Sequence, residues 1–401
     1  MTMRKVRAGA GLATLSLLFF VVTAGTFTSL GVVLPDMVKA LHWDWTQAGL
    51  GYTILGVACG LASYVPALAI RRAGVRATLL VGAAIMAAGF ASLAMARGTQ
   101  LYFLGSALTG GGFALVAVIP GTFVLQRLFT HSSTAFGVYF TAGALGGVAG
   151  PFLYAGARAI GADWRLYWWM LSGVILAVGA LAALASPGGE GAQPVAQDPA
   201  LPHPVRDFTV RQALATPAFW IITAAYTAYL LCETSVNGLS VPHLIDRGVA
   251  PAVAGATLAL QALTNAVARA GAGWLGEQIN PRRLVAGALL AVVVGIGALA
   301  VGQGYAAMGV YVVGVGVGYG VSYLATTVLL LNTFGRTRNL ELFSIMCLVS
   351  TLAAAGPWIG GYVKDRFGGF EAAFWLFAAF ALAALIAVVL MRPPREPLRP
   401  A

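Results

Sequence analysis

The chain has 401 residues, of which 59% are hydrophobic and only 9% are charged. A water-soluble domain carries about 25% charged residues, so this composition excludes a soluble globular protein and indicates an integral membrane protein. The formal net charge is +11, but no basic run is interleaved with aromatic residues, so we expect no nucleic-acid partner.

Long apolar runs, rather than ten-residue alternations, predict transmembrane helices and not an outer-membrane barrel. The first run, residues 9–34, follows Arg4, Lys5 and Arg7, and it is long enough to cross a bilayer. We interpret it as an uncleaved first helix and not as a signal peptide. Further spans centre near residues 57, 86, 113, 143, 175, 229, 264, 292, 317, 352 and 381. The sequence therefore predicts an all-α integral membrane protein with twelve transmembrane helices.

A polar stretch rich in Pro, Gly and Gln interrupts this series after the sixth span. It predicts a flexible cytoplasmic linker, 187–215, between an N-terminal six-helix half, 1–186, and a C-terminal six-helix half, 216–401. A shift of 206 residues places Ala149-Gly150-Pro151 on Ala355-Gly356-Pro357 and Arg76 on Arg282. The halves are thus expected to be pseudo-symmetric parallel repeats, with a substrate site between them near the bilayer midplane.

Lys and Arg residues are distributed unevenly between alternate connections. With the N-terminus inside, sixteen of the 24 fall in cytoplasmic connections and seven in outside ones, and Arg269 is left over. The positive-inside bias therefore predicts a multi-pass protein of the cell (inner or plasma) membrane with both termini cytoplasmic. We expect it to be a monomer in the lipid bilayer.

Arg269 is the one basic residue placed within a predicted span, near residues 253–275. Placing an arginine there costs at least about 2.5 kcal/mol, so it needs a partner, an aqueous cavity or an anionic ligand. Asn265 is one helical turn earlier on the same face and adds an amide donor. The pair predicts an anion-binding site, although an arginine that snorkels to the interface or bonds nearby backbone would satisfy the same pattern.

Other polar side chains lie in predicted spans. Glu233 is the one carboxylate well inside a span, and desolvation favours its neutral form, so it is a candidate proton-coupling residue. A carboxyl that simply stays protonated is the alternative. Tyr319 and Tyr323, one turn apart, and Tyr139 are candidate substrate-binding residues, although membrane tyrosines also serve packing.

The basic turns after helices two and eight resemble the signature turn of the major facilitator superfamily. The second copy, residues 273–283, keeps the acidic residue as Glu277 and a trailing Arg282. The first copy, residues 69–76, contains Arg72 and Arg76 but has Arg71 where the family has an acid. The resemblance implies the major facilitator fold and gating roles for Arg72, Arg76, Glu277 and Arg282, with the latch of the first copy missing or rebuilt.

Within that superfamily the chain is most similar to the monocarboxylate porters and oxalate/formate antiporters, on residues 31–35, 41–48, 208–220 and 241–248. Those porters place an Asp or Asn three residues before a substrate-binding Arg on helix eight, and Asn265-Ala-Val-Ala-Arg269 has this spacing. The resemblance therefore implies carboxylate recognition by Arg269. Oxalate transporters carry a second cation on helix eleven, whereas residues 343–362 have none, which favours a monoanion.

The sequence argues against an enzyme, because no HExxH, GxSxG or phosphate loop occurs and the four histidines fall outside the spans. No metal or cofactor is expected. The prediction is a proton-coupled transporter of a lactate- or pyruvate-like anion that works by alternating access. Residues 143–151, GALGGVAGP, resemble an element of drug/proton antiporters, so the alternative is a proton-driven drug or metabolite efflux antiporter.

Overall fold

A computed structural model describes residues 2–129, 133–186, 208–302, 304–335, 338–392 and 394, apart from the side chains of 2–7, 133–134, 273–278 and 340. Every element in these residues is helical. The α-helices are α1 (Thr2–Thr23), α2 (Ser29–Leu41), α3 (Trp45–Leu61), α4 (Val65–Ala94), α5 (Thr99–Val116), α6 (Val118–Leu128), α7 (Ser133–Ala159), α8 (Trp164–Ala185), α9 (Val210–Leu214), α10 (Pro217–Asp246), α11 (Pro251–Gln278), α12 (Pro281–Val301), α13 (Tyr305–Phe334), α14 (Asn339–Ser350), α15 (Gly356–Phe367) and α16 (Glu371–Leu390). Short π or 3₁₀ turns join some of them: η1 (Ala24–Thr28), η2 (Ala62–Tyr64) and η3 (Thr351–Ala355).

The described residues contain 11 helical rods long and apolar enough to cross a membrane. One of them, Trp45–Ala94, has 50 residues, which at about 1.5 Å per residue is more than twice the hydrocarbon thickness. It bends at Gly74, whose φ of 79° is a left-handed value that suits glycine. Division at Gly74 gives twelve crossings, and the predicted all-α membrane fold is confirmed.

The helices divide into two compact units that do not follow chain order. Unit 1 contains Met1–Gln193, Val236–Leu263 and Pro357–Gly369. Unit 2 contains Pro194–Ser235, Thr264–Gly356 and Phe370–Ala401. Helices α10 and α11 therefore each contribute residues to both units. The predicted linker falls mostly on residues 187–207, which lie outside the described residues.

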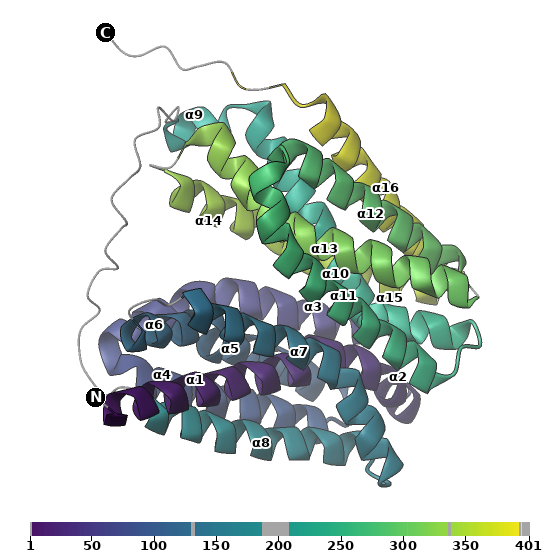
Figure 1. Cartoon of the computed structure of the whole chain (residues 1–401). Coiled ribbons are helices and arrows are strands. Elements are labelled where there is room, and N and C mark those ends of the chain that lie inside the picture. The colour runs from purple at the N-terminus through teal and green to yellow at the C-terminus, as the bar shows by residue number, and fades with distance from the viewer. Residues whose placement is uncertain are drawn as a thin grey trace. The chain divides into compact units, whose positions relative to one another are not determined.

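In unit 1, α1 packs against α7 and α8, and α4 packs against α5 and α8 (Figure 1). Large side chains fill the centre of this bundle. Trp168 stacks on Phe90 with ring centroids 5.6 Å apart, and both are fully buried. The Tyr102 hydroxyl donates a hydrogen bond of 2.6 Å to the Ala48 carbonyl, so its polar end is satisfied inside the bundle.

The first membrane crossing is not a uniform helix. It runs from Ala8 to Leu41 and contains the π-helical turn η1. There the Ser29 hydroxyl donates to the Ala24 carbonyl at 2.6 Å and lies 2.6 Å from the Tyr167 hydroxyl. Side-chain hydroxyls that bond backbone carbonyls are a usual way to stabilise such a turn inside a membrane.

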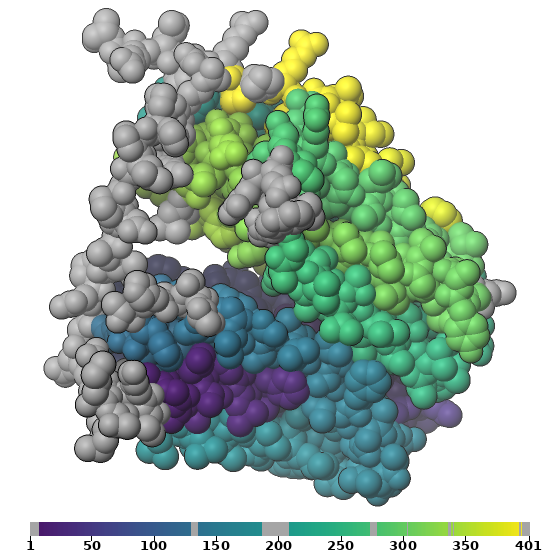
Figure 2. All heavy atoms as spheres, viewed as in Figure 1, coloured from purple at the N-terminus to yellow at the C-terminus, as the bar shows by residue number. Residues whose placement is uncertain are grey.

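In unit 2, α12 packs against α13 and α16 (Figure 1), and Figure 2 shows atoms of these helices on the outer face of the unit. The first part of α10 is bonded to α14 and η3. The Thr227 and Ser350 hydroxyls are 2.9 Å apart, and the Thr234 hydroxyl donates to the Ala353 carbonyl at 2.9 Å. These bonds fix the depth of α10 within the unit, and with it the depth of Glu233.

Two arginines separated by 206 residues make equivalent hydrogen bonds, each within its own unit. Arg76 Nε donates to the carbonyl of Ser186, just after α8, at 2.8 Å. Arg282 Nε donates to the carbonyl of Val388, near the end of α16, at 2.8 Å. Each arginine satisfies a carbonyl at a helix C-terminus, where a positive charge also complements the helix dipole.

Candidate functional site

Arg269 lies on α11 inside the candidate span Pro251–Ala272, in the part of the helix that belongs to unit 2. It is the single charged residue of that span, and it is exposed within the protein. An arginine keeps its charge at any physiological pH, so this helix carries a permanent cation inside an apolar segment.

Two tyrosine rings of α13 face the Arg269 guanidinium. Its Cζ lies 5.6 Å from the centre of the Tyr319 ring and 5.5 Å from that of Tyr323. Cations within about 6 Å of a ring centre are attracted by its π-electrons. The predicted site residues Arg269, Tyr319 and Tyr323 are therefore brought together.

A glycine allows this approach. A Cβ on Gly320 would lie 2.6 Å from the Asn265 carbonyl oxygen and 2.9 Å from the Arg269 backbone nitrogen, so only glycine fits between α13 and α11 here. Gly314 and Gly318, by contrast, approach the backbone of α12. The glycine run of α13 thus packs this helix closely against two neighbours and fixes the Tyr319 side chain next to Arg269.

Helix α10 extends the aromatic group. The Tyr229 ring lies 5.5 Å from the Tyr319 ring, and Tyr226 lies 5.1 Å from Tyr229. We call Arg269, Tyr319, Tyr323, Tyr229 and Tyr226 the arginine–tyrosine cluster. The sequence analysis did not assign Tyr226 and Tyr229 to the site. Their helical spacing relative to Glu233, with Tyr229 one turn before it, is the signal that could have identified them.

Glu233 is 6% exposed on α10 and interacts electrostatically with Tyr319. Tyr319 thus interacts with both the candidate proton-coupling carboxyl and the candidate anion-binding guanidinium. Tyr319 thus lies beside a permanent cation and interacts with an ionisable acid, so gain or loss of a proton by Glu233 would change the electrostatic surroundings of Tyr319.

Asn265 lies one turn before Arg269 on α11. Its side-chain oxygen is buried, and no hydrogen-bond partner for that oxygen occurs among the described residues. Its backbone carbonyl lies where α13 approaches most closely, at Gly320. Asn265 is therefore held at the edge of the cluster by helix packing.

Tyr139 belongs to unit 1 and is fully buried there. Its hydroxyl donates to the Ala117 carbonyl at 2.8 Å, and its ring stacks on Phe19 with centroids 4.7 Å apart. The ring also occupies the space that a side chain at Gly121 would need. Within unit 1, Tyr139 therefore joins α7 to α1 and α6.

The candidate gating residues have different surroundings. Arg76 and Arg282 cap helix C-termini, as described above, and Arg72 is exposed on α4. The side chain of Glu277 lies outside the described residues. Within the described chain, no group of three or more His, Cys, Asp or Glu residues is arranged to hold a metal ion.

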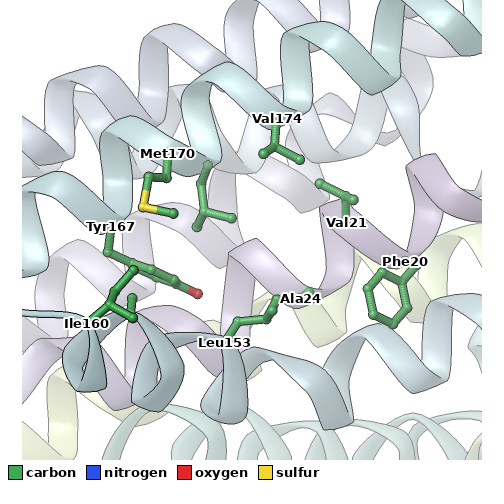
Figure 3. Close-up of a pocket in the computed structure, with 10 residues that line it drawn as sticks. Phe20, Val21, Ala24, Leu153, Ile160, Tyr167, Met170 and Val174 are labelled. Carbon is green, nitrogen blue, oxygen red and sulfur yellow. The ribbon is translucent and has the colours of Figure 1, made fainter. Parts of the chain in front are cut away.

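A separate cavity of about 280 Å³ lies in unit 1 between α1, α7 and α8 (Figure 3). Its lining includes Phe20, Val21, Leu153, Ile160 and Met170. The Tyr167 hydroxyl is its one polar side-chain group and is already bonded to Ser29. Because the lining carries no charge, this cavity offers nothing to hold an anion.

Comparison with known proteins places residues 15–401 in one family. The model of the Major Facilitator Superfamily matches residues 15–235 and 225–401. Monocarboxylate transporter 11 of Mus musculus is 28% identical over 391 residues, covering 90% of this chain and 82% of the relative. The Homo sapiens protein of the same name is also 28% identical, over 90% of this chain and 78% of its own length.

Solved structures of transporters share the fold at low identity. The nucleoside transporter NupG superposes with a TM-score of 0.72 at 15% identity, covering 94% of this chain and 97% of the other. A bacterial homolog of the human lysosomal transporter Spinster gives 0.70 at 16% identity, covering 96% and 94%. Because the family model matches both residues 15–235 and residues 225–401, the chain belongs to the major facilitator superfamily of membrane transporters.

Proposed function

We propose that this secondary transporter carries a small organic monocarboxylate, a lactate- or pyruvate-like anion, and that Arg269 binds its carboxylate. The observation that carries the proposal is the exposed Arg269 guanidinium beside the Tyr319 and Tyr323 rings inside a candidate membrane span. Attraction to the rings uses the positive charge of the guanidinium, while its N–H groups still match the two oxygens of a carboxylate.

The surroundings of Arg269 favour a monoanion over a dianion. It is the single charged residue of its span, and residues 343–362, which form most of α14 and α15, contain no Lys or Arg. One cation neutralises one carboxylate, whereas a second carboxylate would be left desolvated without a partner. The similarity to monocarboxylate transporter 11 supports the same substrate class.

Within this proposal Glu233 carries the coupled proton. Its burial disfavours a charged carboxylate, and its electrostatic interaction with Tyr319 links it to the anion site. A bound anion would favour the protonated acid, so substrate and proton would bind together. Asn265 and the hydroxyl of Tyr319 would orient the substrate beside Arg269.

The wider organisation is proposed on sequence grounds. The two six-helix halves, 1–186 and 216–401, with the linker 187–215 between them, would alternate access to the site as a monomer. The distribution of Lys and Arg puts both termini on the cytoplasmic side of the cell membrane.

The test is ligand binding to purified protein, measured as a rise in melting temperature. The panel contains lactate, pyruvate, a dicarboxylate, an aromatic acid and a lipophilic cation, each applied to wild type and to Arg269→Ala. Ligand that binds the folded state stabilises it by mass action. Stabilisation by monocarboxylates that disappears in Arg269→Ala supports the proposal. Stabilisation by lipophilic cations that persists in the variant would instead support drug efflux and refute it.

A further inference from the structure

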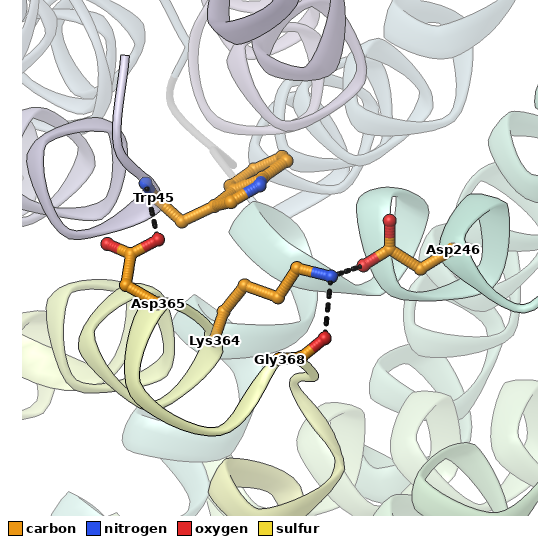
Figure 4. A network of polar contacts seen from close by, with 5 residues as sticks. All are labelled: Trp45, Asp246, Lys364, Asp365 and Gly368. Carbon is orange, nitrogen blue, oxygen red and sulfur yellow. Dashed lines mark hydrogen bonds and ion pairs between the residues drawn. The ribbon is translucent and has the colours of Figure 1, made fainter.

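The N-terminus of α3 is capped from a distant part of the chain, within unit 1. The Asp365 carboxylate on α15 accepts hydrogen bonds from the backbone N–H of Trp45 at 3.1 Å and of Thr46 at 2.7 Å. It also accepts one from the Thr46 hydroxyl at 2.5 Å. Figure 4 shows the carboxylate directed at the first turn of α3. A negative group there satisfies orphan donors and complements the helix dipole.

The residue at the N-cap position of α3 does not cap the helix. Asp44 is the N-cap residue of α3, with the extended backbone (φ −73°, ψ 150°) that an N-cap needs, yet its side chain makes no capping hydrogen bond. Asp163, in the same position before α8, accepts from the Leu166 N–H at 2.8 Å. An aspartate at the N-cap of α8 thus makes the usual local cap, whereas at α3 the distant Asp365 makes it instead.

The contact that brings Asp365 to α3 is close and depends on glycine. A Cβ on Gly361 would lie 2.1 Å from the Trp45 carbonyl oxygen, and one on Gly49 would lie 2.1 Å from that of Pro357. Beside Asp365, Lys364 forms an ion pair with Asp246 at the end of α10 and donates to the Gly368 carbonyl at 3.1 Å (Figure 4). Helix α15 is thus anchored to α10, and its carboxylate bonds α3.

We propose that Asp44 and Asp365 form a cap-exchange latch. In the present state Asp365 caps α3 and joins it to α15. When α15 separates from α3, as transporters of this superfamily require when the two ends of the bundle open in turn, Asp44 caps the same turn. Because α3 is capped in both states, opening does not leave its N–H groups unpaired. The two carboxylates compete for one helix end and set the balance between the states.

The latch predicts a non-additive pair of substitutions. Asp44→Ala removes the cap from the open state alone and should lower the open population about fivefold, the usual effect of losing one N-cap. Asp365→Ala alone should raise it by no more than about threefold, because Asp44 can then cap α3 in either state. In the double variant, neither state has a cap on α3. The open population should therefore be about fivefold higher in the double variant than in Asp44→Ala alone.

The open population can be followed without any substrate, so the test does not depend on the proposed function. Gly255 is buried on α11, and a Cβ there would lie 3.8 Å from Pro151 and 4.0 Å from Val32, at the contact of α11 with α7 and α2. A Gly255→Cys variant, with Cys59, Cys232 and Cys347 replaced by alanine, is labelled with a water-soluble maleimide. Its labelling rate reports how often this contact opens.

Asp163→Ala is the matched control, because it removes a local cap from α8 and should leave the labelling rate unchanged. If Asp365→Ala fails to fold, Asp365→Asn is measured in both backgrounds and should show the same ordering. A labelling rate that Asp44→Ala leaves unchanged or raises would overturn the proposal. The proposal would also be overturned if Asp365→Ala changed the labelling rate by the same factor with and without Asp44. A simple latch without cap exchange predicts such additive effects.

Discussion

The Arg269 guanidinium carbon lies 5.5 Å from the centre of the Tyr323 ring and 5.6 Å from the centre of the Tyr319 ring. The two tyrosines are one turn apart on α13. Two ring faces therefore stabilise a charge that would otherwise be costly inside a membrane span. Tyr323 is 42% exposed, whereas Tyr229 behind Tyr319 is 1% exposed, so one side of the cluster is accessible and the other is closed.

Arg269→Lys should weaken monocarboxylate binding by about 10- to 100-fold, although it keeps the positive charge. An ammonium is a point charge and cannot form the two parallel hydrogen bonds that a guanidinium gives a carboxylate. The measurement is the ligand concentration that gives half-maximal thermal stabilisation. Arg338→Lys is the matched control, because Arg338 is an exposed residue paired with Glu341, and it should leave binding unchanged. Full binding by Arg269→Lys would contradict bidentate recognition.

Tyr319→Phe and Tyr323→Phe separate the hydroxyl from the ring. Tyr319→Phe removes the hydroxyl that is proposed to orient the substrate beside Arg269, so binding should weaken about fivefold. Tyr323→Phe keeps the ring face that contacts the cation and should leave affinity within about twofold. Titration of both variants with the same monocarboxylate checks this order. A larger loss in Tyr323→Phe would mean that its hydroxyl contacts the substrate.

The fold and the position of Arg269 could be predicted from the sequence, because both depend on one-dimensional signals. Apolar run length identifies the crossings, and a single arginine in residues 251–272 is conspicuous against them. The i, i+4 spacing also places Tyr319 and Tyr323 on one face of α13.

The partners across helices could not be predicted in this way. That Tyr319 meets Tyr229 depends on the depths at which α13 and α10 are fixed. The contact of Gly320 with Asn265 on α11 fixes α13, and the contact between the Thr227 and Ser350 hydroxyls fixes α10. The capping of α3 by Asp365 joins residues about 320 positions apart, and no local pattern encodes it.

Gly320→Ala should destabilise the protein and weaken anion binding together. Its methyl group would lie 2.6 Å from the Asn265 carbonyl oxygen, which forces α13 and α11 apart and costs about 1–3 kcal/mol. Gly309→Ala on the same helix is the control, because no atom lies within 4 Å of that position, and alanine there should be neutral or slightly stabilising. The measurement is the melting temperature of Gly320→Ala and of Gly309→Ala, each with and without ligand. Equal melting temperatures would show that α13 does not depend on this contact.

Glu233→Gln should abolish acid-stimulated uptake into proteoliposomes while leaving counterflow exchange of the substrate intact. Glutamine resembles the protonated acid in size and hydrogen-bonding groups but cannot release a proton, so the loaded carrier can still exchange while net proton-coupled movement stops. The reason to expect this of Glu233 is its burial together with its electrostatic interaction with Tyr319.

The control for Glu233→Gln is Glu341→Gln, which changes an exposed carboxylate paired with Arg338 and should leave the pH dependence of uptake as in wild type. Uptake is measured with an imposed pH gradient of either sign, and counterflow without a gradient. An unchanged response of Glu233→Gln to the gradient would assign the proton to another group. Loss of counterflow as well would mean that the Glu233 carboxyl is needed for substrate binding itself.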